Sequence, residues 1–163
     1  MNPCPCGYYT DPGKECTCQP IAIQKYMAKI SGPLLDRIDL HIEVPAVKYK
    51  ELSSKESGEA SENVRDRVTK AREIQTLRFR GRKGLFANAD MQSKEIREFC
   101  KLDAAGEELL KMAITKLGLP ARAYDRILKV ARTIADMAGS ADIRPEHISE
   151  AIQYRSLDRN LMV

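Results

Sequence analysis

The chain has 163 residues, of which 43% are hydrophobic and 31% are charged, and its formal net charge at pH 7 is +4. This length suits one ordinary domain, or a small domain beside part of another. No apolar run approaches the ~18 residues of a membrane span, and the opening residues, MNPCPCG, show neither the basic region nor the apolar core of a signal peptide. The composition therefore argues against a membrane protein and predicts a cytoplasmic location.

Residues 1–20 are rich in proline and glycine and show neither helical nor strand periodicity, which predicts a loop. Four of the five cysteines fall within it in the pattern C-x-C-x9-C-x-C: Cys4, Cys6, Cys16 and Cys18. A Pro-Gly turn at residues 12–13 is expected to bring the two pairs face to face.

Four thiolates in tetrahedral geometry suit Zn²⁺, and a site with four cysteines is structural because no position remains for water. The pattern therefore favours a structural zinc ion over reduced, unligated cysteines or an oxidised pair. An odd number of cysteines without a secretion signal argues against a disulfide framework. Catalysis by these thiols is not expected, because no histidine lies near them in the sequence.

The next elements are a predicted helix and a predicted strand. Within residues 21–30, apolar side chains recur with helical spacing at Ile23, Tyr26, Met27 and Ile30. After a small-residue turn at residues 31–33, side chains from Ile38 to Val44 alternate between apolar and polar, with the period of two typical of a strand. Arg37 would then lie at the mouth of this strand. An ion pair with Asp36 or Asp39 is the simpler interpretation of Arg37.

Residues 46–60 are rich in Ser, Lys and Glu, which predicts a linker. Residues 61–163 read as a helical bundle. Helices are expected from Ser61 to near Gly81, from Gln92 to Cys100, from Asp103 to Gly118, from Tyr124 to Ala138, and from Pro145 onward. The predicted inward residues are Val64, Val68, Ala71, Ile74, Leu77, Ile96, Phe99, Cys100, Leu109, Leu110, Ala113, Ile114, Leu117, Tyr124, Ile127, Leu128, Ala131, Ile134, Ala135, Ala138, Ile148, Ala151 and Ile152.

The segment from Glu62 to Lys83 carries eight basic and three acidic residues. Its end, RFRGRK, places Phe79 between arginines, an arrangement that can hold a phosphate backbone and stack on a base. The candidate nucleic-acid contacts are Arg78, Arg80, Arg82 and Lys83. The alternative is a solvated helix end, whose positive charges favour the helix dipole.

Three stretches together resemble the bacterial magnesium-chelatase-related, competence-protein-M-like AAA+ ATPases. They are NPCPCG at residues 2–7, SGPLLDRIDLH at residues 31–41, and GLPARAYDRILKVARTIADMAG followed by IRPEHISEAIQYR at residues 118–155. The resemblance extends over most of the chain. It implies a mainly α fold, namely a helical AAA+ lid domain at residues 61–163, preceded by a remnant of the α/β AAA+ core at residues 1–45 with its cysteine loop, one helix and one strand.

The resemblance also implies roles for three residues. Arg37 falls on the arginine finger, which one subunit offers to the γ-phosphate held by its neighbour. Asn2 falls on sensor 1, which positions the attacking water, and Arg122 falls on sensor 2, which contacts nucleotide phosphates within its own subunit or across the boundary. Pro120 stands where the family usually has a serine cap, and proline is well tolerated at a helix start. Arg126 and Arg132, on the same helix, are interpreted as solvated or ion-paired.

The implied parent protein is a ring, expected to be hexameric, that binds ATP and Mg²⁺ between subunits and drives DNA branch migration. The sequence contains no G-x-x-x-x-G-K-[ST] loop, so the chain alone is not expected to hydrolyse ATP. Two alternatives remain: a chelatase subunit that drives Mg²⁺ insertion into a porphyrin, and a zinc and nucleic-acid binding module without enzymatic activity.

Overall fold

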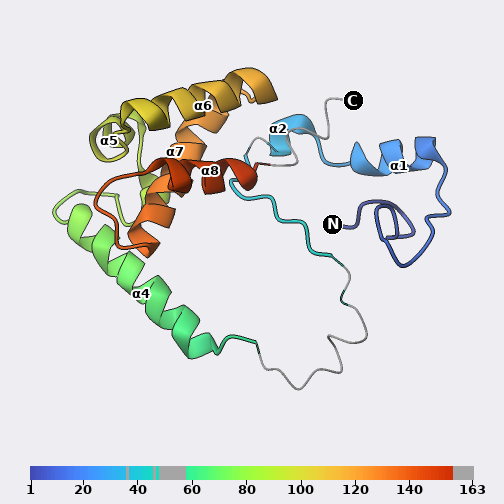
Figure 1. The fold of residues 1–163 in the computed structure, drawn as a ribbon, viewed down its shortest axis with the longest axis horizontal. Helices are drawn as coiled ribbons and strands as arrows, with labels where there is room; N and C mark the ends of the chain where they lie inside the picture. The colour runs from blue at the N-terminus through green and yellow to red at the C-terminus, as the bar shows by residue number, and fades with distance from the viewer. Residues whose placement is uncertain (36, 46, 48–57, 156–163) are drawn as a thin grey trace. The chain divides into compact units, whose positions relative to one another are not determined.

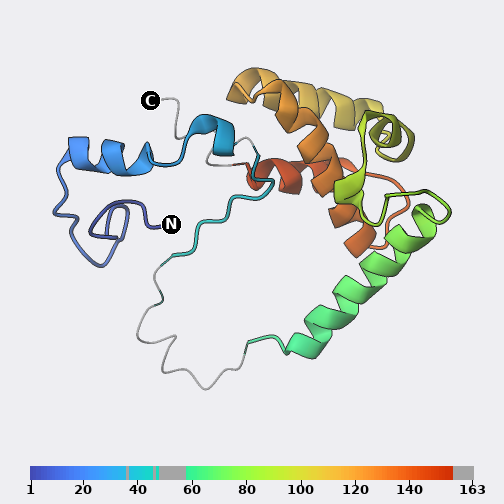
Figure 2. The same ribbon diagram turned by 180° about the vertical axis from the view of Figure 1, so that it is seen from behind.

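The structure is a computed structural model that describes residues 1–35, 37–45, 47 and 58–155. Over these residues the fold is mainly helical, which confirms the predicted fold class (Figures 1 and 2). The described parts of Met1–Ile38 and Ile42–Glu56 form one compact unit, here called the cysteine-loop unit. Those of Asp39–His41 and Ser57–Val163 form a second, the helical unit. The predicted limits at residues 45 and 61 stay a prediction.

The cysteine-loop unit contains two helices, α1 (Pro20–Met27) and the short α2 (Gly32–Leu35). Proline at the first position of α1 fits the fixed backbone angle of a helix start. The predicted apolar side of α1 is its more buried side, although none of its residues is fully buried. Among the hydrophobic residues described in this unit, only Cys4 and Leu35 are buried. The unit therefore has little apolar core.

The strand predicted over Ile38–Val44 is not formed, and no residue in the described ranges is in a strand. Its alternating apolar side chains are exposed, with Ile42 at 67% and Val44 at 81%. A strand exists only where a neighbouring strand accepts and donates its backbone hydrogen bonds. The described residues provide no partner strand, so the prediction of a strand here is wrong.

The helical unit has the five predicted helices and a short 3₁₀ turn. In chain order they are α4 (Ser61–Arg78), η1 (Asn88–Asp90), α5 (Ser93–Phe99), α6 (Ala104–Leu117), α7 (Ala121–Met137) and α8 (Pro145–Gln153). Local signals explain their limits. The Asp103 carboxylate accepts a 2.7 Å hydrogen bond from the Gly106 N–H at the start of α6. Gly118 ends α6 with φ of 62°, a left-handed conformation that favours glycine.

Helix α7 is the centre of the helical unit and contacts α4, α5, α6 and α8. Its buried apolar residues are Ala123, Ile127, Leu128, Ala131 and Ala135. They join one core with side chains from the other helices, including Leu110, Ile148 and Ile152. Full burial of such a side chain contributes roughly 1.5–3 kcal/mol. Packing around α7 therefore makes a large contribution to the stability of this unit.

Five predicted core residues are exposed: Val64, Val68, Leu77, Tyr124 and Ala138. Tyr124 lies in the first turn of α7, next to the fully buried Ala123, and Ala138 follows the last residue of α7. On α4, all residues from Ser61 to Lys70 are exposed, including Val64 and Val68. Only the C-terminal half of α4 packs on the core, so a periodic face predicts orientation but not how far the neighbouring helix extends. Leu77 is also exposed.

No helix in the described ranges is long and apolar enough to cross a membrane.

Candidate functional site

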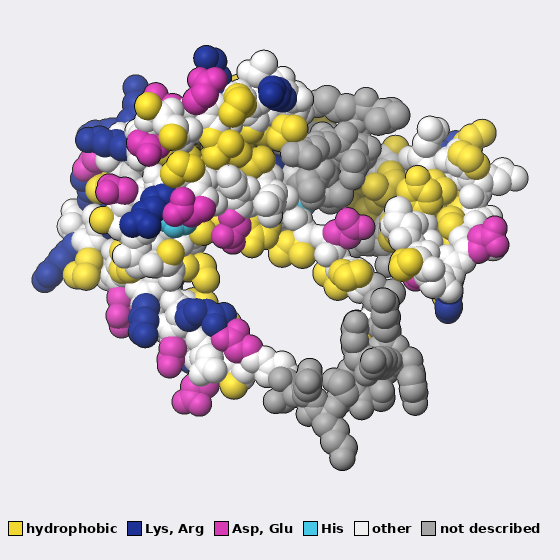
Figure 3. Space-filling view, viewed as in Figure 1, with side chains coloured by type: hydrophobic (Ala, Val, Ile, Leu, Met, Phe, Trp, Pro, Cys, Tyr) yellow, Lys and Arg dark blue, Asp and Glu magenta, His cyan; other side chains and the backbone are white. Residues whose placement is uncertain are grey.

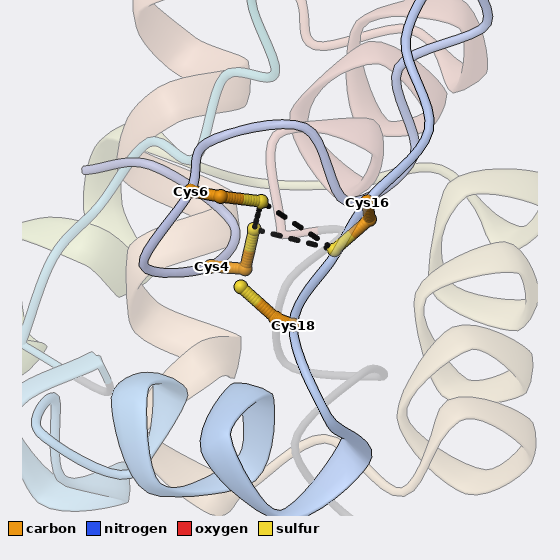
Figure 4. Close-up of side chains that lie close together, drawn as sticks. All are labelled: Cys4, Cys6, Cys16 and Cys18. Carbon is orange, nitrogen blue, oxygen red and sulfur yellow. Dashed lines mark hydrogen bonds between the residues drawn. The ribbon is translucent and has the colours of Figure 1, made fainter.

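The cysteine loop is folded by two tight turns that bring its four thiols together (Figure 4). The Gly7 N–H donates to the Cys4 carbonyl at 3.1 Å, and Gly7 adopts φ of 85°, which a residue with a side chain rarely does. The predicted turn at Pro12–Gly13 is tied by a 2.7 Å hydrogen bond from the Gly13 N–H to the Asp11 carboxylate. The chain reverses between the two cysteine pairs, as the sequence predicted.

The four sulfur atoms point toward one another and all lie within 4.8 Å of one another. The Sγ of Cys4 lies 3.3 Å from that of Cys6 and 3.8 Å from that of Cys16, and Cys6 and Cys16 are 3.6 Å apart. Four sulfurs at a Zn–S distance of 2.3 Å in a tetrahedron would be separated by about 3.8 Å. All four cysteines are free thiols. The donor set and the spacing fit one tetrahedral metal ion.

Hydrogen bonds polarise this cluster. A backbone hydrogen bond from Tyr8 is the largest cause that lowers the pKa of Cys6 to about 6, and bonds to the neighbouring thiols lower it further against the effect of burial. A backbone hydrogen bond at Cys18 lowers the pKa of Cys16. Burial and hydrogen bonds to the other thiols have the larger, opposite effect and raise this pKa to about 12. The Tyr9 N–H donates to the buried Sγ of Cys4 at 3.4 Å. The cluster thus favours a thiolate at Cys6.

Asn2, the residue expected to act as sensor 1, lies at the start of the same loop and is exposed. A side chain added at Gly7 would meet the Asn2 amide at 3.5 Å, so Asn2 lies against the turn that carries Cys4 and Cys6. The sensor role of Asn2 stays a prediction.

Arg37, the expected arginine finger, follows α2 and is exposed. Its N–H donates to the Leu34 carbonyl at 3.0 Å, which continues the turn of α2 by one residue. One alternative for Arg37 was an ion pair with Asp39. The Asp39 carboxylate contacts the guanidinium of Arg126 on α7. Asp36, the other alternative partner, lies outside the described residues.

Arg122, the expected sensor 2, is the second residue of α7 and is exposed. The N-cap is Pro120, which offers no side-chain hydrogen bond, and the first turn of α7 contains no acidic residue. Within the described part of the chain Arg122 forms no ion pair. Its guanidinium therefore adds to the positive end of the α7 dipole, an arrangement that attracts phosphate.

The four candidate nucleic-acid residues differ in environment. Arg78 is engaged inside the helical unit: its guanidinium donates to both carboxylate oxygens of Asp136, and its side chain is only 13% exposed. Arg82 pairs with Glu98 and lies 4.8 Å from the centre of the Phe99 ring. Arg80 and Lys83 are exposed.

Phe79 does not have the position that base stacking needs. Its ring is 2% exposed and packs edge to face against Phe99, with ring centres 5.6 Å apart. The prediction that Phe79 stacks on a base is therefore wrong, because the aromatic ring is part of the core.

Acidic and basic side chains are interleaved along α4 rather than separated by sign (Figure 3). Arg80 and Lys83 are the two members of the set that remain exposed for phosphate contact.

Sequence reasoning missed the polar network around Asp136. Asn88 donates to Asp136 at 2.8 Å, and the Arg132 Nε donates to it at 3.1 Å. Arg132 also donates to the carbonyls of Ala141 and Ser140, at 2.7 and 2.6 Å, which ties the loop after α7 to that helix. The available signal was the Arg132–Asp136 pair, which is spaced by four residues and lies next to the apolar face of α7.

Two family models together match most of this chain. The model described as magnesium chelatase, subunit ChlI, matches residues 1–52, and the model described as magnesium chelatase, subunit ChlI C-terminal, matches residues 58–155. The second match alone covers more than half of the chain. The chain belongs to the magnesium-chelatase ChlI family.

Named relatives within this family cover nearly the whole chain. The chain is 46% identical over 162 residues to the competence protein ComM of Haemophilus influenzae and 43% identical over 163 residues to YifB of Escherichia coli, with 99% of this chain covered in both cases. It is 34% identical over 154 residues to Rv2897c of Mycobacterium tuberculosis, with 94% covered. The chain spans about 30% of the length of these relatives. The ChlI family match confirms the predicted resemblance.

Proposed function

We propose that this chain forms the lid and subunit-contact part of a ring-shaped AAA+ ATPase of the magnesium-chelatase ChlI family that acts on DNA. The supporting observation is the 46% identity to a competence protein, which extends over 99% of this chain and includes the cysteine loop, the Arg37 segment and α7. The name of this relative, a competence protein, favours a DNA motor over a subunit for metal insertion. A hexameric ring and a cytoplasmic location belong to the same proposal.

In the assembled ring, ATP would lie between subunits, and Mg²⁺ would neutralise charge on its phosphates. The chain contains no phosphate-binding loop, so residues outside it would hold Mg²⁺ and the triphosphate. Arg122 fits a phosphate contact because its guanidinium stands exposed at the positive end of α7 without a competing acid in the first turn.

Arg37 fits a finger because it is exposed and bears a planar, permanently charged fork. It would enter the neighbouring subunit's site and stabilise the charge that develops on the γ-phosphate. Asn2 would orient the attacking water from the same subunit that holds the nucleotide. The four cysteines fit a structural zinc ion, which would hold the loop after Asn2 in one conformation.

The DNA contact would be made by Arg80 and Lys83, while Arg78 and Arg82 are engaged in ion pairs with Asp136 and Glu98. This narrows the expectation that all four residues contact phosphate. The alternative function is a chelatase subunit acting on a porphyrin. It is supported by the two matching family models, which both describe a magnesium-chelatase subunit. The DNA-acting function is favoured because the named relatives that cover the chain include a competence protein.

The finger is tested in a protein of the relatives' full length, of which this chain spans about 30%. Arg37→Ala should lower ATP turnover by about 10³-fold, as for other arginine fingers. Mixing Arg37→Ala subunits with subunits disabled in the phosphate loop should restore turnover at the mixed interfaces. Arg97→Ala, an exposed arginine on α5, is the matched control and should leave turnover unchanged. Normal turnover by the Arg37→Ala protein would remove Arg37 from the catalytic machinery.

DNA binding is tested through its salt dependence. Because each phosphate contact releases counterions, replacing both Arg80 and Lys83 by alanine should flatten the plot of log affinity against log salt by roughly two units. Arg65→Ala with Lys70→Ala, which removes the same charge from the exposed half of α4, is the control. ATP turnover that responds to a porphyrin and not to DNA would instead favour the chelatase alternative.

A further inference from the structure

The short segment Asp39–His41 belongs to the helical unit, although the residues on both sides of it belong to the cysteine-loop unit. Two contacts anchor it. The Asp39 carboxylate forms an ion pair with Arg126 on α7, and the His41 N–H donates to the Tyr154 carbonyl, after the end of α8, at 2.7 Å. The His41 side chain is 5% exposed. The chain is thus fastened to the helical unit immediately after the position of Arg37.

Covalent geometry ties both ends of this ion pair to the two proposed nucleotide-contact arginines. Asp39 follows Arg37 by two residues, and two residues of extended chain span at most about 7 Å. Arg126 follows Arg122 by four residues on α7, which is one helical turn, or about 6 Å along the axis on the same side of the helix. The Asp39–Arg126 contact therefore joins the residue next to the finger to the turn that carries sensor 2.

The exposure of this ion pair argues against a role in stability. The side chains of Arg126 and Asp39 are 27% and 51% exposed, and ion pairs in such positions contribute little to the stability of the fold. An interaction of that size is too weak to hold a domain together. It is strong enough to favour one orientation of a short segment, and it acts together with the backbone hydrogen bond of His41 to hold that segment.

We propose that Asp39 and Arg126 are positioning residues that couple Arg37 to Arg122 within one subunit. This inference rests on the proposed function, and it adds a route of communication between sites. When phosphate draws Arg122 and α7 toward a nucleotide, Arg126 carries Asp39 with it, and Asp39 shifts the adjacent Arg37. Contact between Arg122 and phosphate would therefore set the position of the finger.

The inference is tested by ATP turnover in the full-length protein. Asp39→Ala and Arg126→Ala should each lower kcat by about ten- to a hundredfold, the loss expected from a misplaced catalytic group, and leave KM for ATP unchanged. Combining Asp39→Ala with Arg37→Ala should lower kcat no further than Arg37→Ala alone. Exchanging the charges, with Asp39→Arg and Arg126→Asp together, should recover most of the kcat lost in either exchange alone.

The matched control is the ion pair between Glu59 and Arg67 on the exposed half of α4, which is of the same type and similarly exposed. Glu59→Ala should leave kcat unchanged. A second readout does not depend on ATP: hydrogen exchange of the peptide that contains His41. The His41 amide should exchange faster in the Asp39→Ala protein and at the wild-type rate in the Glu59→Ala protein.

The outcomes separate the two proposals. A full-length protein that does not hydrolyse ATP overturns the proposed function. If the protein hydrolyses ATP and Arg37→Ala abolishes this, but Asp39→Ala keeps kcat within about twofold of wild type, the coupling is wrong while the function stands. Unchanged His41 exchange in the Asp39→Ala protein also overturns the coupling, because Asp39 then does not anchor the segment.

Discussion

In the helical unit an apolar core surrounds α7, whereas in the cysteine-loop unit only Cys4 and Leu35 are buried among its described hydrophobic residues. The helical unit also fixes its geometry with a buried polar network centred on Asp136. In place of an apolar core and a buried polar network, the cysteine-loop unit has four converging thiols. Burial of apolar surface can stabilise the first unit, but a chain segment with so little core needs a cross-link.

Metal removal should produce the largest difference between the two units. We expect about one zinc ion per chain by elemental analysis. Free energies of binding for structural zinc are about 10–16 kcal/mol, so Cys4→Ser with Cys16→Ser, or a strong chelator, should abolish hydrogen-exchange protection in residues 1–18. The α7 amides should keep their protection, because their core does not include these thiols.

The control for the metal site is Cys100→Ala, which removes a thiol from the other unit and should leave the zinc content unchanged. A protein without zinc, in which all four loop thiols react at once with a thiol reagent, would contradict the site.

The second comparison concerns the buried network. Asp136→Ala removes the carboxylate that Arg78 and Arg132 share and leaves two guanidinium groups without it. Breaking a buried ion pair in this way costs about 3–5 kcal/mol, to be measured by urea unfolding of the helical unit. Asp142→Ala, at an exposed carboxylate after α7, should change the free energy of unfolding by less than about 0.5 kcal/mol. Equal effects of the two variants would show that the network is dispensable.

The third comparison uses the one cysteine that lies in the helical core. Burial is the main cause that raises the pKa of Cys100 from 9.0 to about 11. The folded chain therefore keeps this proton at pH values where the unfolded chain has lost it. The resulting contribution to stability, up to about 3 kcal/mol, is complete below pH 9.0 and is lost as the pH rises through about 11.

This contribution is measured as a difference between two proteins. The free energy of unfolding of the wild type, minus that of Cys100→Ala, should be constant below about pH 8 and should fall as the pH rises above about 9. A difference that does not change with pH would mean that the thiol titrates alike in both states. Other groups that titrate in this range are common to both proteins and cancel.

Local signals made most of this fold predictable. The positions of α5, α6, α7 and α8 follow from helical periodicity together with Asp103, Gly118 and Pro145 at their ends. The cysteine cluster follows from the spacing of its residues and the intervening turn. The strand predicted at Ile38–Val44 is not formed, because alternation in the sequence does not by itself provide the neighbouring strand that pairing requires.

The polar contacts of the candidate site between residues far apart in the sequence could not be predicted. Arg78 and Asp136 are 58 residues apart in sequence, so nothing local distinguished Arg78 from Arg80 as a surface cation. The Asp39–Arg126 pair spans 87 residues and was likewise invisible. Arg37, Asn2 and Arg122 were assigned through family resemblance, and their roles rest on the proposed function.

The hydrogen bonds from Arg132 to the carbonyls of Ser140 and Ala141 also bear on how the protein folds. They close the loop between α7 and α8, two helices that are neighbours both in sequence and in space. Closing a short loop costs little chain entropy, so contacts of this kind can form before distant ones. We expect the α7–α8 hairpin to be largely formed in the folding transition state, with α4 joining it later through Arg78. Ile148→Val should then slow folding, whereas Ala71→Gly should chiefly accelerate unfolding.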